Sequence, residues 1–176
     1  LFRSGQVYFH ILPDPGQPFV LRVGEDVLTT EQGRFQLTCL DDRPDVVVEQ
    51  GRMSLASHGA EASVVRLEGG QRADVGGGPP RVSAADIEAE TAWRLGRLVV
   101  RDRPLREVVE AFNRYSTDQL SVEDRAAGEK RISGSFRYDG GREFALALAS
   151  GFALSAIQGA DGVWRIRTPD ETATLR

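Results

Sequence analysis

The stretch Trp93-Arg94-Leu95-Gly96-Arg97-Leu98-Val99-Val100-Arg101-Asp102-Arg103-Pro104-Leu105 marks a change in the pattern of the sequence. Before it, short apolar runs alternate with turn residues, and after it strand-like runs alternate with helix-like ones. Asp102 suits a helix N-cap, because its carboxylate can accept free backbone N–H groups, and Pro104 follows where a missing N–H costs nothing. The helix predicted from Pro104 has one apolar face, formed by Leu105, Val108, Val109 and Phe112.

A length of 176 residues allows one large or two small domains, and we predict two. Residues 1–78 show strands at a spacing of roughly nine residues with turn residues between them. This pattern predicts an all-β domain and leaves a sandwich, a barrel and a twisted β-solenoid-like stack open. Within it we expect separate strands at Val46–Val48 and Met53–Leu55, joined by a tight turn at Gln50-Gly51.

Residues 79–95 are predicted to be a linker and a bridging helix. The linker is marked by Gly76-Gly77-Gly78-Pro79-Pro80, because glycine removes backbone preference and proline forbids ladder hydrogen bonds. The helix is expected from Ser83 to Trp93, with Ser83 as its cap and Asp86 three residues further on.

Residues 96–168 contain two similar strand–helix–strand patterns and a closing hairpin. They predict a small βαβ-βαβ sandwich, followed by a frayed tail at residues 169–176. The fold class expected for the whole chain is therefore α+β.

The composition argues against several classes of function. Acidic residues (26) outnumber basic ones (22) and the pI is near 5.3, which disfavours non-specific electrostatic binding to nucleic acid or to anionic membranes. The single cysteine, Cys39, allows no intrachain disulfide and no thiolate metal cluster, and its alternating surroundings predict a small buried thiol. No apolar run approaches the ~20 residues that span a bilayer and no signal peptide opens the chain. Because a strand pattern already begins at Leu1, we expect further segments to precede it.

No constellation of residues predicts catalysis or metal binding. His10 and His58 lack a metal-binding spacing, and Glu88 and Glu90 diverge on the predicted helix, so they cannot work as an acid/base pair. The acidic turn that contains Asp41, Asp42 and Asp45 lacks the register of a calcium loop. We therefore predict no enzymatic activity, no cofactor and no metal site.

Several blocks of the sequence resemble the periplasmic domain of FecR-type transmembrane anti-sigma regulators. These blocks are Gly5–Phe9, Pro18–Gly24, Val46–Leu55, Leu67–Gln71, Trp93–Val100, Pro104-Leu105 and Asn113–Ser116. A further block, Ile132–Phe136, is similar to the short N-terminal domain shared by secretins and TonB-dependent receptors, which that family carries at its C-terminus. The resemblance covers nearly the whole chain, and the order and spacing of the blocks carry it.

The resemblance implies a location, a role and a set of partners. In the family, a cytoplasmic anti-sigma segment and one transmembrane helix precede this region, which lies in the periplasm. The region receives a signal from the N-terminal signalling domain of an outer-membrane TonB-dependent transducer, usually one that imports a ferric siderophore. Periplasmic and intramembrane proteases then cut the regulator and free an extracytoplasmic-function sigma factor.

The chain departs from this family at one position. Some members cleave themselves between a Gly and a Thr in the segment aligned with Gly33-Arg34-Phe35, where the Thr hydroxyl is the nucleophile. Arg34 has no hydroxyl, so we predict that this chain stays intact there. Mass spectrometry of the purified chain would contradict this by showing fragments split after Gly33.

Binding of a partner protein is the function predicted for the second half. An outer strand of a small sandwich exposes N–H and C=O groups to which a partner strand can add. The candidates are the Leu98–Arg101 strand and the closing strand that starts at Val163. Leu98, Val100, Phe136 and Trp164 could instead fill the core, whereas alternation should turn Arg101, Arg165 and Arg167 outward. The candidate partner-binding residues are Leu98, Val99, Val100, Arg101, Val163, Arg165 and Arg167.

Two other functions stay open at this point. The short C-terminal domain would also suit a structural module of a secretin-like secretion system, although the first half fits that role poorly. A carbohydrate-binding β domain would need aromatic side chains on one face, and Tyr8 and Phe9 point to opposite faces of their strand.

Overall fold

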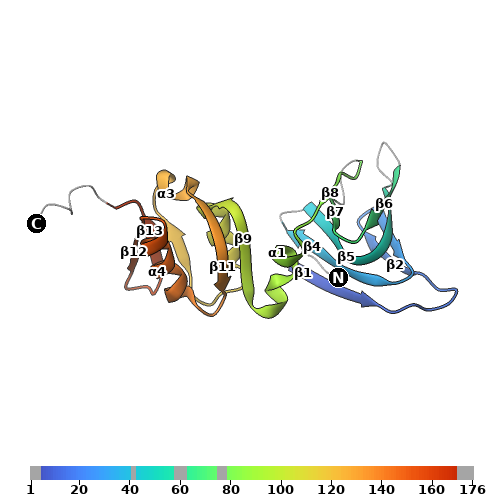
Figure 1. The fold of residues 1–176 in the computed structure, drawn as a ribbon, viewed down its shortest axis with the longest axis horizontal. Coiled ribbons are helices and arrows are strands. Elements are labelled where there is room, and N and C mark those ends of the chain that lie inside the picture. Colours follow the sequence, from blue (N-terminus) through green and yellow to red (C-terminus); the bar gives the residue numbers. More distant parts are fainter. Residues whose placement is uncertain (1–4, 41–42, 58–62, 75–78, 170–176) are drawn as a thin grey trace, which may run out of the picture. The chain divides into compact units, whose positions relative to one another are not determined.

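The computed structural model describes residues 5–40, 43–57, 63–74 and 79–169, in which strands dominate and helices are few (Figure 1). The chain divides into two compact units, Leu1–Glu90 and Thr91–Arg176. No helix of the described ranges has the length and apolar character needed to cross a membrane.

The first unit is built on one curled antiparallel sheet, which has eight strands among the described residues. Its strands are β1 (Gly5–Ile11), β2 (Phe19–Val23), β3 (Asp26–Thr30), β4 (Gly33–Leu40), β5 (Arg43–Ser57), β6 (Ser63–Glu68), β7 (Gln71–Asp74) and β8 (Val82–Ala84). The order β1-β4-β5-β3-β2 forms the main path, and β6 and β7 also pair with β5. All these pairings are antiparallel, and apolar side chains of the curled sheet pack together in one core.

The long strand β5 corrects the prediction of a tight turn at Gln50-Gly51. It runs without interruption for 15 residues, pairing with β4 and β7 in its first half and with β3 and β6 in its second. A register shift places Arg34 opposite Gln50 and Phe35 opposite Val48, so that Glu49 is an extra residue in β5. This extra residue forms a bulge, which increases the local twist without ending the ladder, so the strand continues through Gln50-Gly51.

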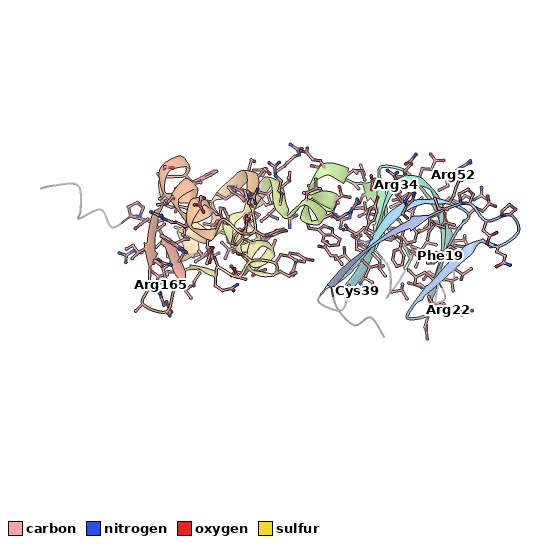
Figure 2. All side chains as sticks on the ribbon, turned by 90° about the horizontal axis from the view of Figure 1, so that it is seen from below. Phe19, Arg22, Arg34, Cys39, Arg52 and Arg165 are labelled. Atoms are coloured by element: carbon pink, nitrogen blue, oxygen red, sulfur yellow. The ribbon has the colours of Figure 1, made fainter. Side chains whose placement is uncertain are left out.

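Apolar side chains from the curled sheet form the first core. The ring of Phe35 is buried and stacks on Phe9 with centroids 4.7 Å apart. It also meets Phe19, which Figure 2 labels, with centroids 5.9 Å apart. Leu28, Leu55 and Leu67 complete the centre. Cys39 packs against this cluster but is half-buried, not fully buried as predicted, and burial raises the pKa of its thiol.

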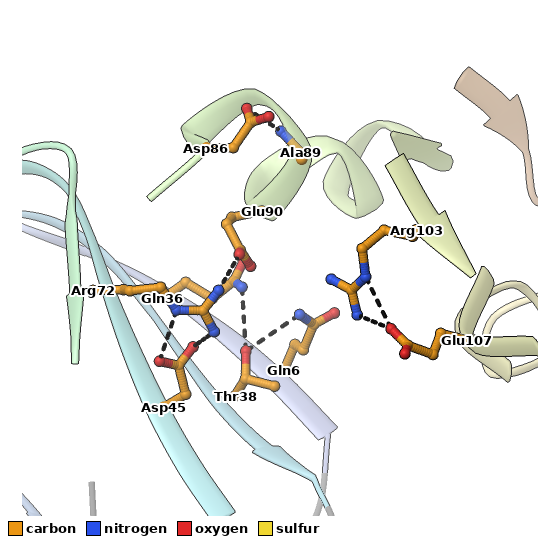
Figure 3. Close-up of polar contacts among 10 residues, drawn as sticks. All are labelled: Gln6, Gln36, Thr38, Asp45, Arg72, Asp86, Ala89, Glu90, Arg103 and Glu107. Carbon is orange, nitrogen blue, oxygen red and sulfur yellow. Dashed lines mark hydrogen bonds and ion pairs between the residues drawn. The ribbon is translucent and has the colours of Figure 1, made fainter. Parts of the chain in front are cut away.

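The helix predicted from Ser83 to Trp93 is wrong at its start. Val82–Ala84 forms β8 and pairs with β7, and the helix α1 covers only Ile87–Thr91. Asp86, not Ser83, accepts the backbone N–H of Ala89, at 3.2 Å (Figure 3). As a strand, Val82–Ala84 pairs its backbone groups with β7, whereas the first turn of a helix leaves its N–H groups without an intrahelical partner. The glycine–proline stretch therefore precedes a strand of the first unit, although its residues 76–78 lie outside the described ranges.

The second unit contains short helices and small sheets. Its elements are η1 (Ala92–Leu95), β9 (Arg97–Pro104), α2 (Leu105–Asn113), β10 (Leu120–Val122), α3 (Arg125–Glu129), β11 (Arg131–Arg137), α4 (Gly141–Gly151), β12 (Ser155–Gln158) and β13 (Trp164–Arg167). The described strands pair as β10-β13-β12 and as β11-β9. The two strands that flank α2, and likewise the two that flank α4, belong to different sheets. Apart from α3, which the sequence pattern did not predict, the elements follow the predicted order, but the helices do not connect neighbouring parallel strands as in a βαβ unit.

Helix α2 confirms the predicted apolar face. Leu105, Val108, Val109 and Phe112 are all buried. The Phe112 ring meets Phe144 of α4 at 4.8 Å, which locks the two helices together in the second core.

The predicted N-cap of α2 is wrong. Asp102 lies within β9 with φ +52° and receives two hydrogen bonds from Arg131, at 3.0 and 2.8 Å. Pro104 occupies the N-cap position, without a side-chain hydrogen bond. Asp102 instead belongs to a bulge, in which Arg101 and Asp102 of β9 face the single residue Ser133 of β11.

Candidate protein-binding surface

The strands β9 and β11 form a ladder with open flanks. They pair antiparallel, with Leu98 opposite Phe136 and Val100 opposite Gly134, and they lie side by side in Figure 1. Within the described residues, no other strand pairs with either of them. The predicted outer strand Leu98–Arg101 is therefore at an edge, and so is β11, which the sequence did not single out.

The predicted residues of β9 divide between the core and the surface. Leu98 and Val100 are buried in the second core, Val99 is half-buried and Arg101 is exposed. Only Val99 and Arg101 of this group can therefore offer side chains to a partner.

The closing strand is not an edge, which corrects the second prediction. β13 lies between β10, with which it pairs in parallel, and β12, with which it pairs antiparallel. Both flanks of its ladder are used, so no partner strand can add to it. Although β13 is the last strand in the sequence, it lies in the middle of its sheet.

The side chains of the closing segment are held by local contacts. Val163 precedes β13 and is half-buried, and Arg167 is half-buried too. Arg165 donates to both carboxylate oxygens of Asp161, at 3.0 and 2.6 Å (Figure 2 labels Arg165). This contact lowers the pKa of Asp161 to about 2. The arginine that was predicted to bind a partner thus closes the β12–β13 turn.

The β9–β11 ladder is rich in arginine. The two strands together carry five arginines and one aspartate, whereas the chain as a whole has a net charge of −4. Arg97 and Arg137 lie directly opposite each other, an arrangement in which like charges repel. Arg137 donates to Asp139 at 2.8 and 2.7 Å, and Arg97 donates to the Ser135 hydroxyl at 3.0 Å. These contacts hold both guanidinium groups on the surface.

A groove of about 570 Å³ runs between β11 and α4. Phe136, Phe144 and Ala147 supply its apolar lining, and the charged groups Arg137, Asp139 and Glu143 line it as well. The rings of Phe136 and Phe144 are 4.2 Å apart. The sequence left open whether Phe136 fills the core, and it did not indicate Phe144 or Ala147, because the turn that brings α4 beside β11 has no signature in the strand itself.

The first unit holds a polar cluster with no predicted role. Arg72 of β7 donates to both carboxylate oxygens of Asp45, at 3.3 and 2.7 Å, and to Glu90 of α1 at 2.6 Å (Figure 3). Burial raises the pKa of Asp45 to about 6, against the lowering effect of Arg72. The cluster fastens α1 to the sheet.

Nothing in the described residues groups three or more metal-binding side chains. His10 is exposed on β1, and His58 lies outside the described ranges, as do Asp41 and Asp42 of the acidic turn. Arg34 is exposed on β4 (Figure 2).

No protein-family model matches the sequence, and no curated protein matches it either. The solved structures that match the fold include two crystal structures of a candidate anti-sigma factor from Parabacteroides distasonis ATCC 8503. The matches have TM-scores of 0.71 and 0.72 at 18% sequence identity. Each covers 95% of this chain, and they cover 78% and 79% of the matched chains. The likeness shows that this chain shares the fold of those proteins over both of its units.

Proposed function

We propose that this chain is the periplasmic, signal-receiving region of a membrane-anchored anti-sigma regulator. It binds the N-terminal signalling domain of an outer-membrane TonB-dependent transducer and so controls an extracytoplasmic-function sigma factor. Uptake of iron as a ferric siderophore is the process in which we place it. The chain acts through protein contacts, without catalysis, cofactor or metal.

The fold likeness to candidate anti-sigma factors is the observation that carries this proposal. It extends over 95% of the chain, so it includes the β-sheet unit as well as the α/β unit. A small α/β domain alone would fit many proteins, but the succession of these two units narrows the choice. The sequence blocks that resemble FecR-type regulators occur in both units and add independent support.

The remaining partners follow from this role. The sigma factor is bound by a cytoplasmic segment of the same regulator, and periplasmic and intramembrane proteases release it after the signal. Nucleic acid is not a partner, because an acidic chain lacks the net positive charge that phosphate binding requires.

A binding panel tests the proposal. The 176-residue chain is immobilised and challenged with purified signalling domains from several TonB-dependent transducers, and each captured domain is measured by titration calorimetry. We expect saturable one-to-one binding of one signalling domain, and no binding of a secretin N-terminal domain used as a control. The proposal fails if the panel includes the transducer encoded beside this gene and that domain does not bind.

A further inference from the structure

We propose that the outer edge of β11, together with the groove between β11 and α4, accepts an extended segment of the partner as an added strand. The segment carries acidic side chains on one face and apolar side chains on the other. This inference rests on the proposed function, since it names the surface by which the chain receives its partner.

The edge of β11 can extend a ladder more regularly than the edge of β9. β11 is seven residues long and contributes one residue to each position of its ladder. β9 carries the bulge at Arg101-Asp102, and Asp102 has a left-handed backbone conformation that interrupts regular pairing. A strand that adds to a sheet needs a run of evenly spaced N–H and C=O groups, so β11 is the better template.

The groove gives the added strand a place for its apolar side chains. Alternate residues of a strand point to the same face, so every second residue of a segment beside β11 would point toward Phe144 and Ala147. Ala147 is exposed and its small side chain leaves the groove open. Gly134 helps to shape it, because a Cβ at that position would lie only 2.8 Å from the Phe136 ring.

The charged residues of the surface determine which face of the segment carries acidic side chains. A strand added to β11 lies directly beside Arg137, and Arg97 lies opposite Arg137 on the next strand, so both guanidinium groups favour acidic side chains on the outward face of the added strand. The groove is lined by Arg137, which is paired with Asp139, and by Glu143, so the groove side has a net negative charge and favours apolar over acidic side chains. A second copy of β11 would bring arginine against arginine, so the occupant is a different, acidic segment.

A peptide titration tests the surface itself. The uniformly ¹⁵N-labelled chain is titrated with the blocked octapeptide (Glu-Val)4 and, as a control, with (Lys-Val)4, while amide chemical shifts are recorded. We expect shift changes confined to β11 and α4, and larger for the glutamate peptide. Changes elsewhere, equal changes with both peptides, or no changes at all overturn the proposal.

Variants test whether the signalling domain binds at this surface. Arg97→Glu and Ala147→Trp should each weaken binding of the signalling domain about tenfold, by charge reversal and by filling the groove. Arg125→Glu on α3 and Ser150→Trp on α4 change exposed residues away from the groove lining and should leave binding unchanged. Circular dichroism confirms that each variant is folded.

The two proposals fail in different ways. If the signalling domain binds and neither Arg97→Glu nor Ala147→Trp weakens it, this surface is wrong while the proposed function stands. If no signalling domain binds the wild-type chain, the proposed function is wrong, and the peptide titration still decides whether β11 accepts an acidic, apolar strand.

Discussion

At Gly51 the backbone of β5 passes so close to β4 that no side chain fits between them. A Cβ on Gly51 would lie 2.7 Å from the Gln32 carbonyl oxygen, and the residue has φ +97°. Gly51→Ala should therefore lower the free energy of unfolding of the first unit by about 3 kcal/mol, from strain and contact together. Urea unfolding measures this loss.

Gly24 provides the matched control for Gly51. It also has a positive φ, of +60°, but nothing lies within 4 Å of its Cβ position. Gly24→Ala should cost only about 1 kcal/mol, from the backbone conformation alone. Equal losses at the two positions would show that the close approach of Gly51 contributes nothing.

The carboxyl of Asp45 should make stability depend on pH. Its folded pKa of about 6, set by burial against Arg72, lies above the ordinary value of 3.8, so the folded state binds more protons between these pH values. Stability from this group is highest at low pH and is lost as pH rises through 6. Relative to Asp45→Asn, the wild type should gain about 1 kcal/mol between pH 7.5 and pH 5.

Thermal unfolding of both proteins across this range, at constant ionic strength, provides the measurement. Glu90 and Asp74, which also face Asp45 and Arg72, are present in both proteins. A difference between the two proteins that stays constant with pH would mean that Asp45 keeps an ordinary pKa.

Among the elements, the short helix α3 depends on a single capping residue. Asp124 accepts the backbone N–H of Ala127 at 2.8 Å and that of Thr168, beyond β13, at 2.7 Å. These bonds lower its pKa and join the start of α3 to the end of the last strand. Asp124→Ala should lower the melting temperature of the second unit by about 4 °C.

Asp139→Ala is the control for the capping residue. Asp139 also has a lowered pKa, but its partner is the exposed Arg137 side chain, and solvent screens that pair. Its replacement should leave the melting temperature within error. If both variants have the melting temperature of the wild type, the hydrogen bonds that Asp124 accepts from the backbone do not stabilise α3.

The elements also show what sequence patterns can and cannot reveal. The face of α2 was predictable, because Leu105, Val108 and Phe112 repeat at helical spacing and are buried. Helix α3 was missed, since its five residues contain no apolar repeat. The central position of β13 in its sheet could not be predicted either, because it depends on parallel pairing with β10, which no local sequence pattern encodes.

The same limit applies to the candidate site. Arg101 was correctly expected to be exposed, because alternation along a strand is a local property. The groove beside β11 was not predicted, since it needs Phe136 from a strand and Ala147 from a helix to face each other. The arginines of β9 and β11 are visible in the sequence, but only the pairing of these strands places Arg97 opposite Arg137.

At the scale of the whole molecule, the chain has two separate hydrophobic cores. One contains Leu55 and the other contains Phe112 and Leu148. Both tryptophans of the chain, Trp93 and Trp164, pack against the second core, so their fluorescence reports on the second unit alone.

Separate cores should unfold as separate cooperative units, since each buries its own apolar side chains. Leu55→Ala leaves a cavity in the first core and should destabilise that unit by about 3 kcal/mol, which shifts the β-sheet signal in circular dichroism. The tryptophan transition should stay in place. Leu148→Ala should do the reverse, moving the tryptophan transition and leaving the sheet signal of the first unit unchanged. A single transition that shifts equally in both variants, by both probes, would show that the two units unfold as one.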